Sequence, residues 1–167
     1  MTFMKDDDHD ARARARARAV PTDAAFSDRV RLCFSLYAAQ HAFNRLYAPL
    51  LADLGLTYPQ YLVMAALWEE DGRSVGALGE LLHLASNTLT PLLKRLEAAD
   101  LIRRVRSESD ERVVIVTLTD AGAALATQAE MVPCRVLGSV DMSPAEAARL
   151  AREIDALREA LERAGGG

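Results

Sequence analysis

The stretch SVGALGELLHLASNTLTPLLKRLEAADLIRRVRSESDERVVIVTLT, residues 74–119, decides the fold. In its first part apolar residues recur at helical spacing, and a short break divides them into two short helices. Ser74 and Ser86 are predicted to cap these helices, because a serine hydroxyl can accept from the free backbone N–H groups of a first turn. Two β-rich runs follow, Leu101–Val105 and Val113–Leu118, and predict a hairpin with a polar loop.

Upstream of this stretch the sequence predicts two further helices. Apolar residues from Asp28 to about Leu54 lie on one broad stripe, and Gly55 marks the end of that long helix. A second helix is predicted to begin at Thr57, with Pro59 in its first turn, where a missing N–H costs little.

Downstream, Asp120 is predicted to begin a helix that runs to about Met131, and Pro133 interrupts the pattern. Residues 143–146, Ser-Pro-Ala-Glu, open a last amphipathic helix with a cap and an acidic first turn. Half of the residues are hydrophobic and only 5% are aromatic, which favours a mostly helical fold with a small β-hairpin.

Residues 1–23 are predicted to form a disordered tail, because an acidic cluster and the run ARARARARA, residues 11–19, offer no apolar face. The arginines could reach DNA phosphates or the minor groove, or the tail could be a low-complexity segment without a specific role.

Helix, turn, helix and basic hairpin is the layout of a winged helix-turn-helix, whose second short helix enters the major groove of DNA. The net charge of −4 requires a local binding surface rather than a basic protein. The alternative interpretation of these polar residues is helix capping and solvation. The candidate DNA contacts are the polar and charged residues of the second helix and the hairpin: Ser86, Asn87, Thr88, Thr90, Lys94, Arg95, Arg106, Asp110 and Arg112.

The acidic N-terminus lacks the pattern of a signal peptide, and no apolar run is long enough to span a bilayer, so we expect a cytoplasmic protein without membrane contact. Cys33 and Cys134 have neither Cys-x-x-Cys nor zinc spacing, and a reducing compartment argues against a permanent disulfide. The histidines do not cluster with the cysteines, so no metal or other cofactor is expected.

A thiol that reacts with peroxides must form a thiolate, which hydrogen-bond donors or positive charge stabilise. Tyr37 lies one helical turn from Cys33, whereas Tyr47 lies 14 residues away, about 21 Å along a continuous helix. No glycine or proline between Cys33 and Tyr47 permits a fold-back. A contact between them would therefore need a second subunit, and the alternative is an inert cysteine beside core tyrosines.

The segments LTYPQYLVMAALWEEDG, LHLASNTLTPLLKRLEAADLI and SDERVVIVTLTDAG, between Leu56 and Gly122, resemble the MarR family, and specifically its organic hydroperoxide resistance regulators. The resemblance covers about residues 30–135. It implies a homodimer with intertwined terminal helices, in which residues 24–56 and 120–164 form the dimerisation helices and residues 57–119 the DNA-binding region. The reduced dimer would repress transcription at a palindromic double-stranded operator.

The same resemblance implies that Cys33 is the reactive thiol and that Tyr47 and Tyr58 of the partner subunit donate hydrogen bonds to it. Tyr37, one turn away on the same helix, is a further candidate to support the thiolate. Organic hydroperoxides would oxidise Cys33 to a sulfenic acid. Cys134 of the other subunit would then form a disulfide with it, and the operator would be released.

Three functions remain open. The first is a repressor inactivated by peroxide. The second is a repressor of the same fold that is released by a small aromatic ligand in a cleft between the dimer helices and the wings. The third is a thiol peroxidase, which is disfavoured because no acid, base or arginine arrangement can be assigned around the thiol. We therefore expect a regulator and not an enzyme.

Overall fold

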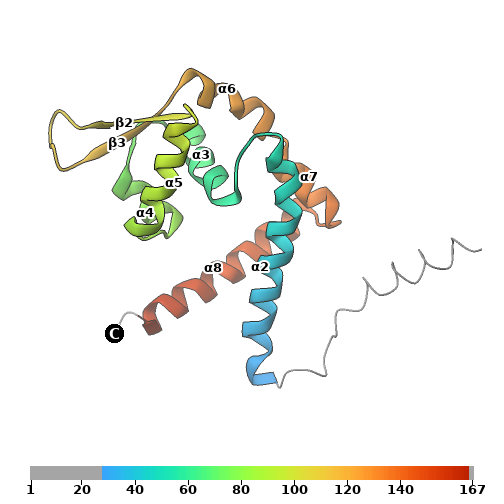
Figure 1. Ribbon diagram of the computed structural model, residues 1–167. Helices are drawn as coiled ribbons and strands as arrows, with labels where there is room; N and C mark the ends of the chain where they lie inside the picture. Colours follow the sequence, from blue (N-terminus) through green and yellow to red (C-terminus); the bar gives the residue numbers. More distant parts are fainter. Residues whose placement is uncertain (1–27, 166–167) are drawn as a thin grey trace, which may run out of the picture. The chain divides into compact units, whose positions relative to one another are not determined.

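The structure is a computed structural model and describes residues 28–165, with side chains from residue 30 onward (Figure 1). The predicted tail, residues 1–23, and the last two glycines lie outside the described residues. The chain divides into two compact units, Met1–Phe43 and Asn44–Gly167. Helix α2 (Asp28–Ala52) begins in the first unit and ends in the second.

The second unit holds the remaining described helices and three short strands, and it confirms the mostly helical fold with a hairpin wing (Figure 1). These elements are α3 (Tyr58–Glu69), β1 (Arg73–Ser74), α4 (Val75–Leu82), α5 (Ser86–Ala98), β2 (Ile102–Arg106), β3 (Val114–Leu118), α6 (Asp120–Ala129), α7 (Val132–Ser139) and α8 (Pro144–Gly165).

The sheet is antiparallel with the strand order β1-β3-β2. The hairpin register pairs Ile102 with Leu118 and Arg106 with Val114, which agrees with the predicted strands to within one residue. Strand β1 was not predicted, because two residues give no alternating pattern; it pairs Arg73 with Val116. The hairpin projects beyond α5, at the left of Figure 1.

The core of the second unit is formed by the apolar faces of α3, α4 and α5, closed by the hairpin and by the end of α2. Its largest fully buried side chains are Leu51, Val63, Met64, Leu67, Leu78, Leu89, Leu93, Leu96, Ile102 and Val116. Because α5 contributes three of these leucines at helical spacing, its opposite face is left to solvent.

The two predicted serine caps have different outcomes. Ser74 caps α4 as predicted, since its hydroxyl oxygen accepts from the backbone N–H of Ala77 at 3.0 Å. The prediction for Ser86 was wrong: Ala85 has extended backbone angles and is the N-cap of α5, without a side-chain bond. The carbonyl oxygen of Ala85 already accepts from the N–H groups of Thr88 and Leu89, so Ser86 is the first helical residue.

The prediction that Pro133 interrupts the fifth helix was incomplete. Helix α6 ends at Ala129, and Pro133 lies in the first turn of a separate helix, α7, which buries Val132 and Val136. A proline is tolerated there because first-turn N–H groups have no partner within the helix. Cys134 consequently lies on α7 and not at the end of α6. The predicted start of α8 is confirmed by Ser143, whose backbone N–H donates to the Glu146 carboxylate at 2.9 Å.

Gly122, in the first turn of α6, lies at a junction of segments that are distant in the sequence. The indole Nε1 of Trp68 donates to the Gly122 carbonyl oxygen at 2.9 Å, and Thr119 Oγ1 accepts from the Gly122 N–H at 3.0 Å. The Thr119 hydroxyl also donates to the carbonyl oxygen of Asp100 at 2.6 Å. This junction ties α3 and α6 to the turn that leads from α5 into the hairpin.

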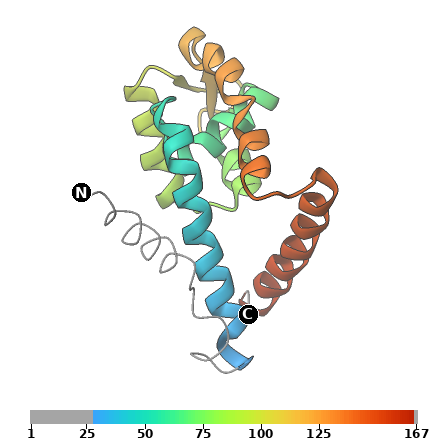
Figure 2. The ribbon, with the colours of Figure 1, turned by 90° about the vertical axis from the view of Figure 1, so that its right-hand side faces the viewer.

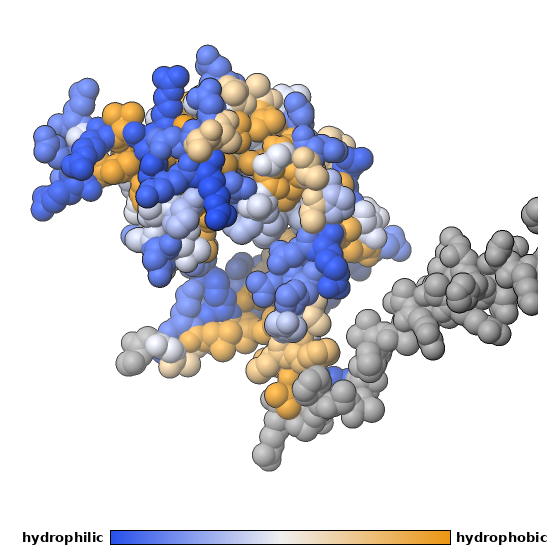
Figure 3. Space-filling model, in the orientation of Figure 1, coloured by the Kyte–Doolittle hydropathy of each residue, from blue (hydrophilic) through white to orange (hydrophobic). Residues whose placement is uncertain are grey.

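Near the C-terminal end of α8, Glu162 Oε1 lies 3.5 Å from Nδ1 of His83, the C-cap residue of α4. The helix otherwise projects away from helices α3 to α6 (Figure 2) and has no buried residue along its length. Its apolar side chains include Leu150, Ile154 and Leu161, which are 41%, 48% and 58% exposed. They recur at helical spacing and form a stripe, visible as orange atoms at the lower left of Figure 3. Among the described residues, no helix combines the length and apolarity needed to cross a membrane.

Candidate nucleic-acid interface and thiol site

Helix α5 presents a polar surface at its N-terminal end. Ser86, Asn87 and Thr88 are exposed there. Thr90 is half-buried, and its hydroxyl donates to the Ser86 carbonyl oxygen at 2.7 Å. Its proton is therefore engaged within the helix. Asn87 Oδ1 accepts from the Thr88 hydroxyl at 3.3 Å, and the exposed Asn87 amide is the strongest candidate for a base contact, because amides pair with base edges in the major groove.

The basic residues of α5 lie away from the core. Lys94 and Arg95 are exposed, while Leu89, Leu93 and Leu96 of the same helix are buried. This placement agrees with contacts to DNA phosphates, which long cationic side chains make at the surface.

The hairpin loop carries a local ion pair. Arg112 Nε lies 3.2 Å from Asp110 Oδ1, and the same carboxylate oxygen accepts from the backbone N–H of Arg112 at 3.0 Å. Arg106 donates from Nη1 to the carbonyl oxygen of Glu111 at 3.3 Å. The hairpin end is strongly hydrophilic (Figure 3). An exposed pair of this kind adds little stability, so its effect is to orient the arginine.

Arg104 of β2 is held by Glu97 of α5. Its Nε donates to Glu97 Oε2 at 3.0 Å, and its backbone N–H donates to Glu97 Oε1 at 3.2 Å. The side-chain hydrogen bond from Arg104 is the main reason that the pKa of Glu97 is lowered. The pair joins the base of the hairpin to the candidate recognition helix.

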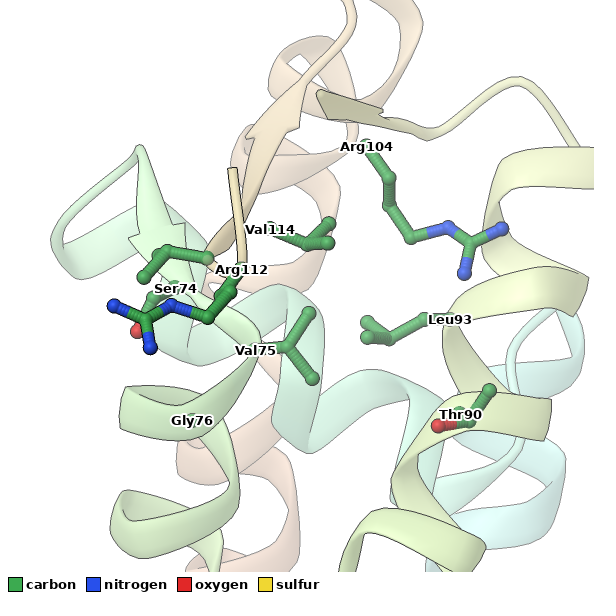
Figure 4. Close-up of a pocket in the computed structure, with 9 residues that line it drawn as sticks. Ser74, Val75, Gly76, Thr90, Leu93, Arg104, Arg112 and Val114 are labelled. Carbon is green, nitrogen blue, oxygen red and sulfur yellow. The ribbon is translucent and has the colours of Figure 1, made fainter. Parts of the chain in front are cut away.

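Beside this pair lies a cavity of about 490 Å³ between α4, α5 and the hairpin (Figure 4). Val75 and Leu93 lie on opposite sides of it, and Thr90 and Arg104 also line it. The cavity thus combines an apolar lining with two cationic side chains, Arg104, which Glu97 engages, and Arg112, which pairs with Asp110.

Both cysteines are free thiols and exposed in the described chain. Cys33 lies on α2 in the first unit, and Cys134 lies on α7 in the second. Tyr37, also in the first unit, is 60% exposed, and its ring contacts that of His41 edge to face with centroids 4.3 Å apart.

Tyr47 and Tyr58 are brought together in the second unit. Their ring centroids are 4.8 Å apart in an edge-to-face arrangement, and Tyr47 is only 7% exposed. Burial, with smaller contributions from Tyr58 and Tyr61, raises the pKa of Tyr47 to about 12. Burial also raises the pKa of Tyr58. Both phenols therefore stay protonated at neutral pH and remain hydrogen-bond donors.

A third tyrosine, Tyr61, which is not among the predicted site residues, belongs to the same cluster. The ring centroid of Tyr61 lies 6.1 Å from that of Tyr47 and 6.4 Å from that of Tyr58. The signal was present in the sequence: Tyr58 and Tyr61 are three residues apart on one helix and therefore share a face.

Comparison with known proteins identifies the family. The family model described as transcriptional regulator SarA/Rot matches residues 45–128. The HTH-type transcriptional regulator TtmR of Methylorubrum extorquens is 49% identical over 78% of this chain and 67% of its own length. The organic hydroperoxide resistance transcriptional regulator of Bacillus subtilis is 44% identical over 78% of this chain and 89% of its own. The chain belongs to the MarR family of DNA-binding transcriptional regulators. These relatives are named as regulators, in agreement with the expectation of a non-enzyme.

Solved structures of AbfR of Staphylococcus epidermidis are similar to this chain. Its reduced form bound to DNA has a TM-score of 0.67 and 37% identity, covering 78% of this chain and 92% of AbfR. Its disulfide form has a TM-score of 0.58 and 33% identity, covering 90% of this chain and 98% of AbfR. The winged helix-turn-helix predicted from residues 74–119 is thus confirmed.

Proposed function

We propose that this MarR-family member is a dimeric repressor that senses organic hydroperoxides through Cys33 and then releases a palindromic operator. The observation that carries the proposal is the pair of buried, protonated phenols, Tyr47 and Tyr58, in a relative of a hydroperoxide regulator. The ring centroids of the two phenols lie 4.8 Å apart, so both can serve one thiolate, which accepts several hydrogen bonds.

The chemistry requires only the thiolate and the oxidant. The sulfur of Cys33 attacks the distal oxygen of the hydroperoxide, an S–O bond forms, the O–O bond breaks, and the alkoxide takes up a proton to leave as an alcohol. The product is a sulfenic acid. The thiol of Cys134 from the partner subunit then attacks the sulfenic sulfur, so that a disulfide forms and water leaves.

A second subunit is needed to bring the tyrosines to the thiol. Helix α2 extends from Asp28 to Ala52 and includes both Cys33 and Tyr47. A continuous helix keeps these two residues of one chain about 21 Å apart, so a Tyr47 side chain that contacts Cys33 must come from the partner subunit. The exposed apolar stripe of α8 supplies surface that a second copy would bury. In the dimer the two α5 helices would read the two halves of a palindrome, and the hairpins would reach the flanking minor grooves.

Release by a small aromatic ligand is the second candidate, and the cavity beside the hairpin is the observation that favours it. The engagement of Arg104 by Glu97 weakens this candidate at that guanidinium, because an acidic ligand would have to displace a bound carboxylate. The cation that such a ligand would meet is Arg112, which also lines the cavity and whose side chain is 92% exposed.

The decisive experiment measures operator binding by the reduced wild type, Cys33→Ser and Cys134→Ser, before and after one equivalent of cumene hydroperoxide. We expect the wild type to release the operator and Cys33→Ser to stay bound. Cys134→Ser should form the sulfenic acid but rebind DNA on mild reduction, since it lacks the interchain disulfide. If Cys33→Ser releases the operator as readily as the wild type does, the redox proposal is wrong. Ligand binding in the cavity would then be tested next.

A further inference from the structure

We propose that Tyr61 is a positioning residue, which holds the rings of Tyr47 and Tyr58 in the orientation that directs their hydroxyls at the thiol of the partner subunit. The inference rests on the proposed redox function and adds a residue to its site. Tyr61 would act through the other two tyrosines and not by touching the reacting sulfur.

The geometry of the cluster supports this role. Tyr61 is 8% exposed and contacts both phenol rings, with interplanar angles of 45° to Tyr47 and 32° to Tyr58. Tyr47 and Tyr58 meet edge to face at 64°, an arrangement that aromatic rings favour. A third ring packed against both restricts their side-chain rotation, so each hydroxyl keeps one direction.

Tyr61 is itself fixed from its other side. Its ring meets that of Trp68 edge to face at 62° with centroids 6.2 Å apart, and the Trp68 indole is hydrogen-bonded to the Gly122 carbonyl. Tyr61 therefore connects the two phenols to the rigid junction of α3, α6 and the hairpin. A side chain held on both sides is suited to preorganise its neighbours.

The electrostatics of the cluster act in the same direction. Tyr61 is among the causes that raise the pKa of Tyr47, and burial raises the pKa of Tyr61 itself. A donor that resists ionisation can stabilise a thiolate without losing its proton to it. At neutral pH all three phenols are protonated, so Tyr61 acts on Tyr47 through the packing of its ring.

The test uses full-length reduced protein with Tyr61→Phe, Tyr61→Leu and Tyr61→Met, and Val63→Ala as a packing control on the same helix, where Val63 is fully buried. Two quantities are measured: the rate constant for oxidation of Cys33 by cumene hydroperoxide, and the pH at which its alkylation by iodoacetamide is half-maximal.

We expect Tyr61→Leu and Tyr61→Met to oxidise about tenfold more slowly, because misdirected groups at a reacting centre cost at least that much. Their alkylation midpoint should move to higher pH, since the thiolate is less stabilised. Tyr61→Phe keeps the ring and should stay within about twofold of the wild type, and Val63→Ala should leave both quantities unchanged. Methionine fills space without branching, so at least one ring-free variant is expected to fold.

Two results would overturn the inference. The first is a folded Tyr61→Leu or Tyr61→Met variant whose Cys33 is oxidised at the wild-type rate. The second is a Val63→Ala variant whose Cys33 is oxidised as slowly as that of Tyr61→Leu. The single tryptophan, Trp68, gives a readout independent of sensing, because its emission should change in Tyr61→Leu even with Cys33 reduced. If Cys33→Ser still releases the operator on oxidation, the proposed function fails. If Cys33→Ser keeps the operator bound but the Tyr61 variants have the wild-type oxidation rate and alkylation midpoint, only the role of Tyr61 is refuted.

Discussion

Tyr47 illustrates how packing sets the chemistry of a single residue. Its hydroxyl would ionise near pH 10 in water, but burial among Tyr58 and Tyr61 raises its pKa to about 12. Removing a phenolate from water is unfavourable, and neighbouring phenols that ionise in the same range add repulsion. The folded protein therefore binds the Tyr47 proton more tightly than the unfolded chain does.

This difference predicts a loss of stability at alkaline pH. Because the folded pKa is raised, the contribution of Tyr47 is fully present below pH 10 and is lost as the pH rises toward about 12. The free energy of unfolding, measured with urea between pH 9 and pH 11.5, should fall by on the order of 2 kcal/mol from this group. Tyr47→Phe should flatten the dependence, and an identical slope in this variant would contradict the assignment.

At the scale of elements, the junction at Gly122 links the helices to the hairpin. A Cβ atom at Gly122 would overlap the carbonyl oxygen of Leu101, which belongs to the backbone and cannot rotate away. The same Leu101 carbonyl accepts from the Thr119 N–H at 3.1 Å, so a displacement would disturb the end of β3 as well. The close approach of α6 to the hairpin therefore depends on a residue without a side chain.

We predict that Gly122→Ala destabilises the protein by about 3 kcal/mol, because backbone must move to admit the methyl group. The matched control is Gly138→Ala in α7, where a Cβ would meet nothing within 4 Å. Alanine is the better helix former there, so the control should be neutral or stabilising by about 0.5–1 kcal/mol. Thermal unfolding of both variants checks this, and equal melting temperatures would show that the junction is not close-packed.

At the scale of the whole molecule, α8 has an amphipathic sequence, and within residues 28–165 its apolar stripe stays exposed to solvent. Leu150, Ile154 and Leu161 would leave a continuous apolar face in water, which soluble monomers generally avoid. The dimer proposed above would bury that face against the second copy.

Ile154→Glu with Leu161→Glu should therefore yield monomers and abolish operator binding at concentrations where the wild type is dimeric, because a charge buried without a partner is strongly unfavourable. Arg152→Glu, on the same helix and exposed, introduces the same charge and should remain dimeric. Sedimentation and operator titration measure both properties. Dimers of the double variant with normal DNA affinity would exclude α8 from the interface.

The sequence by itself determined the elements and their order. The helical periodicity around Leu89, Leu93 and Leu96, the cap at Ser74 and the β-rich runs of the hairpin are local signals, and each element formed where its signal predicted. Local signals failed in three places: the cap of α5 is Ala85 and not Ser86, the two-residue strand β1 has no pattern of its own, and Pro133 begins the separate helix α7. The candidate DNA contacts could also be named from the sequence, because helical periodicity determines which face of a helix each side chain occupies. Their roles at the operator stay predictions.

The tertiary structure decided which distant residues meet. The contacts of Tyr61 with Tyr47, of Glu97 with Arg104 and of Trp68 with Gly122 join different elements. Such contacts depend on how helices and strands pack, and periodicity within one element carries no information about the neighbour it will touch. The thiol site is the extreme case, because in the proposed dimer Cys33 and its tyrosines come from different chains.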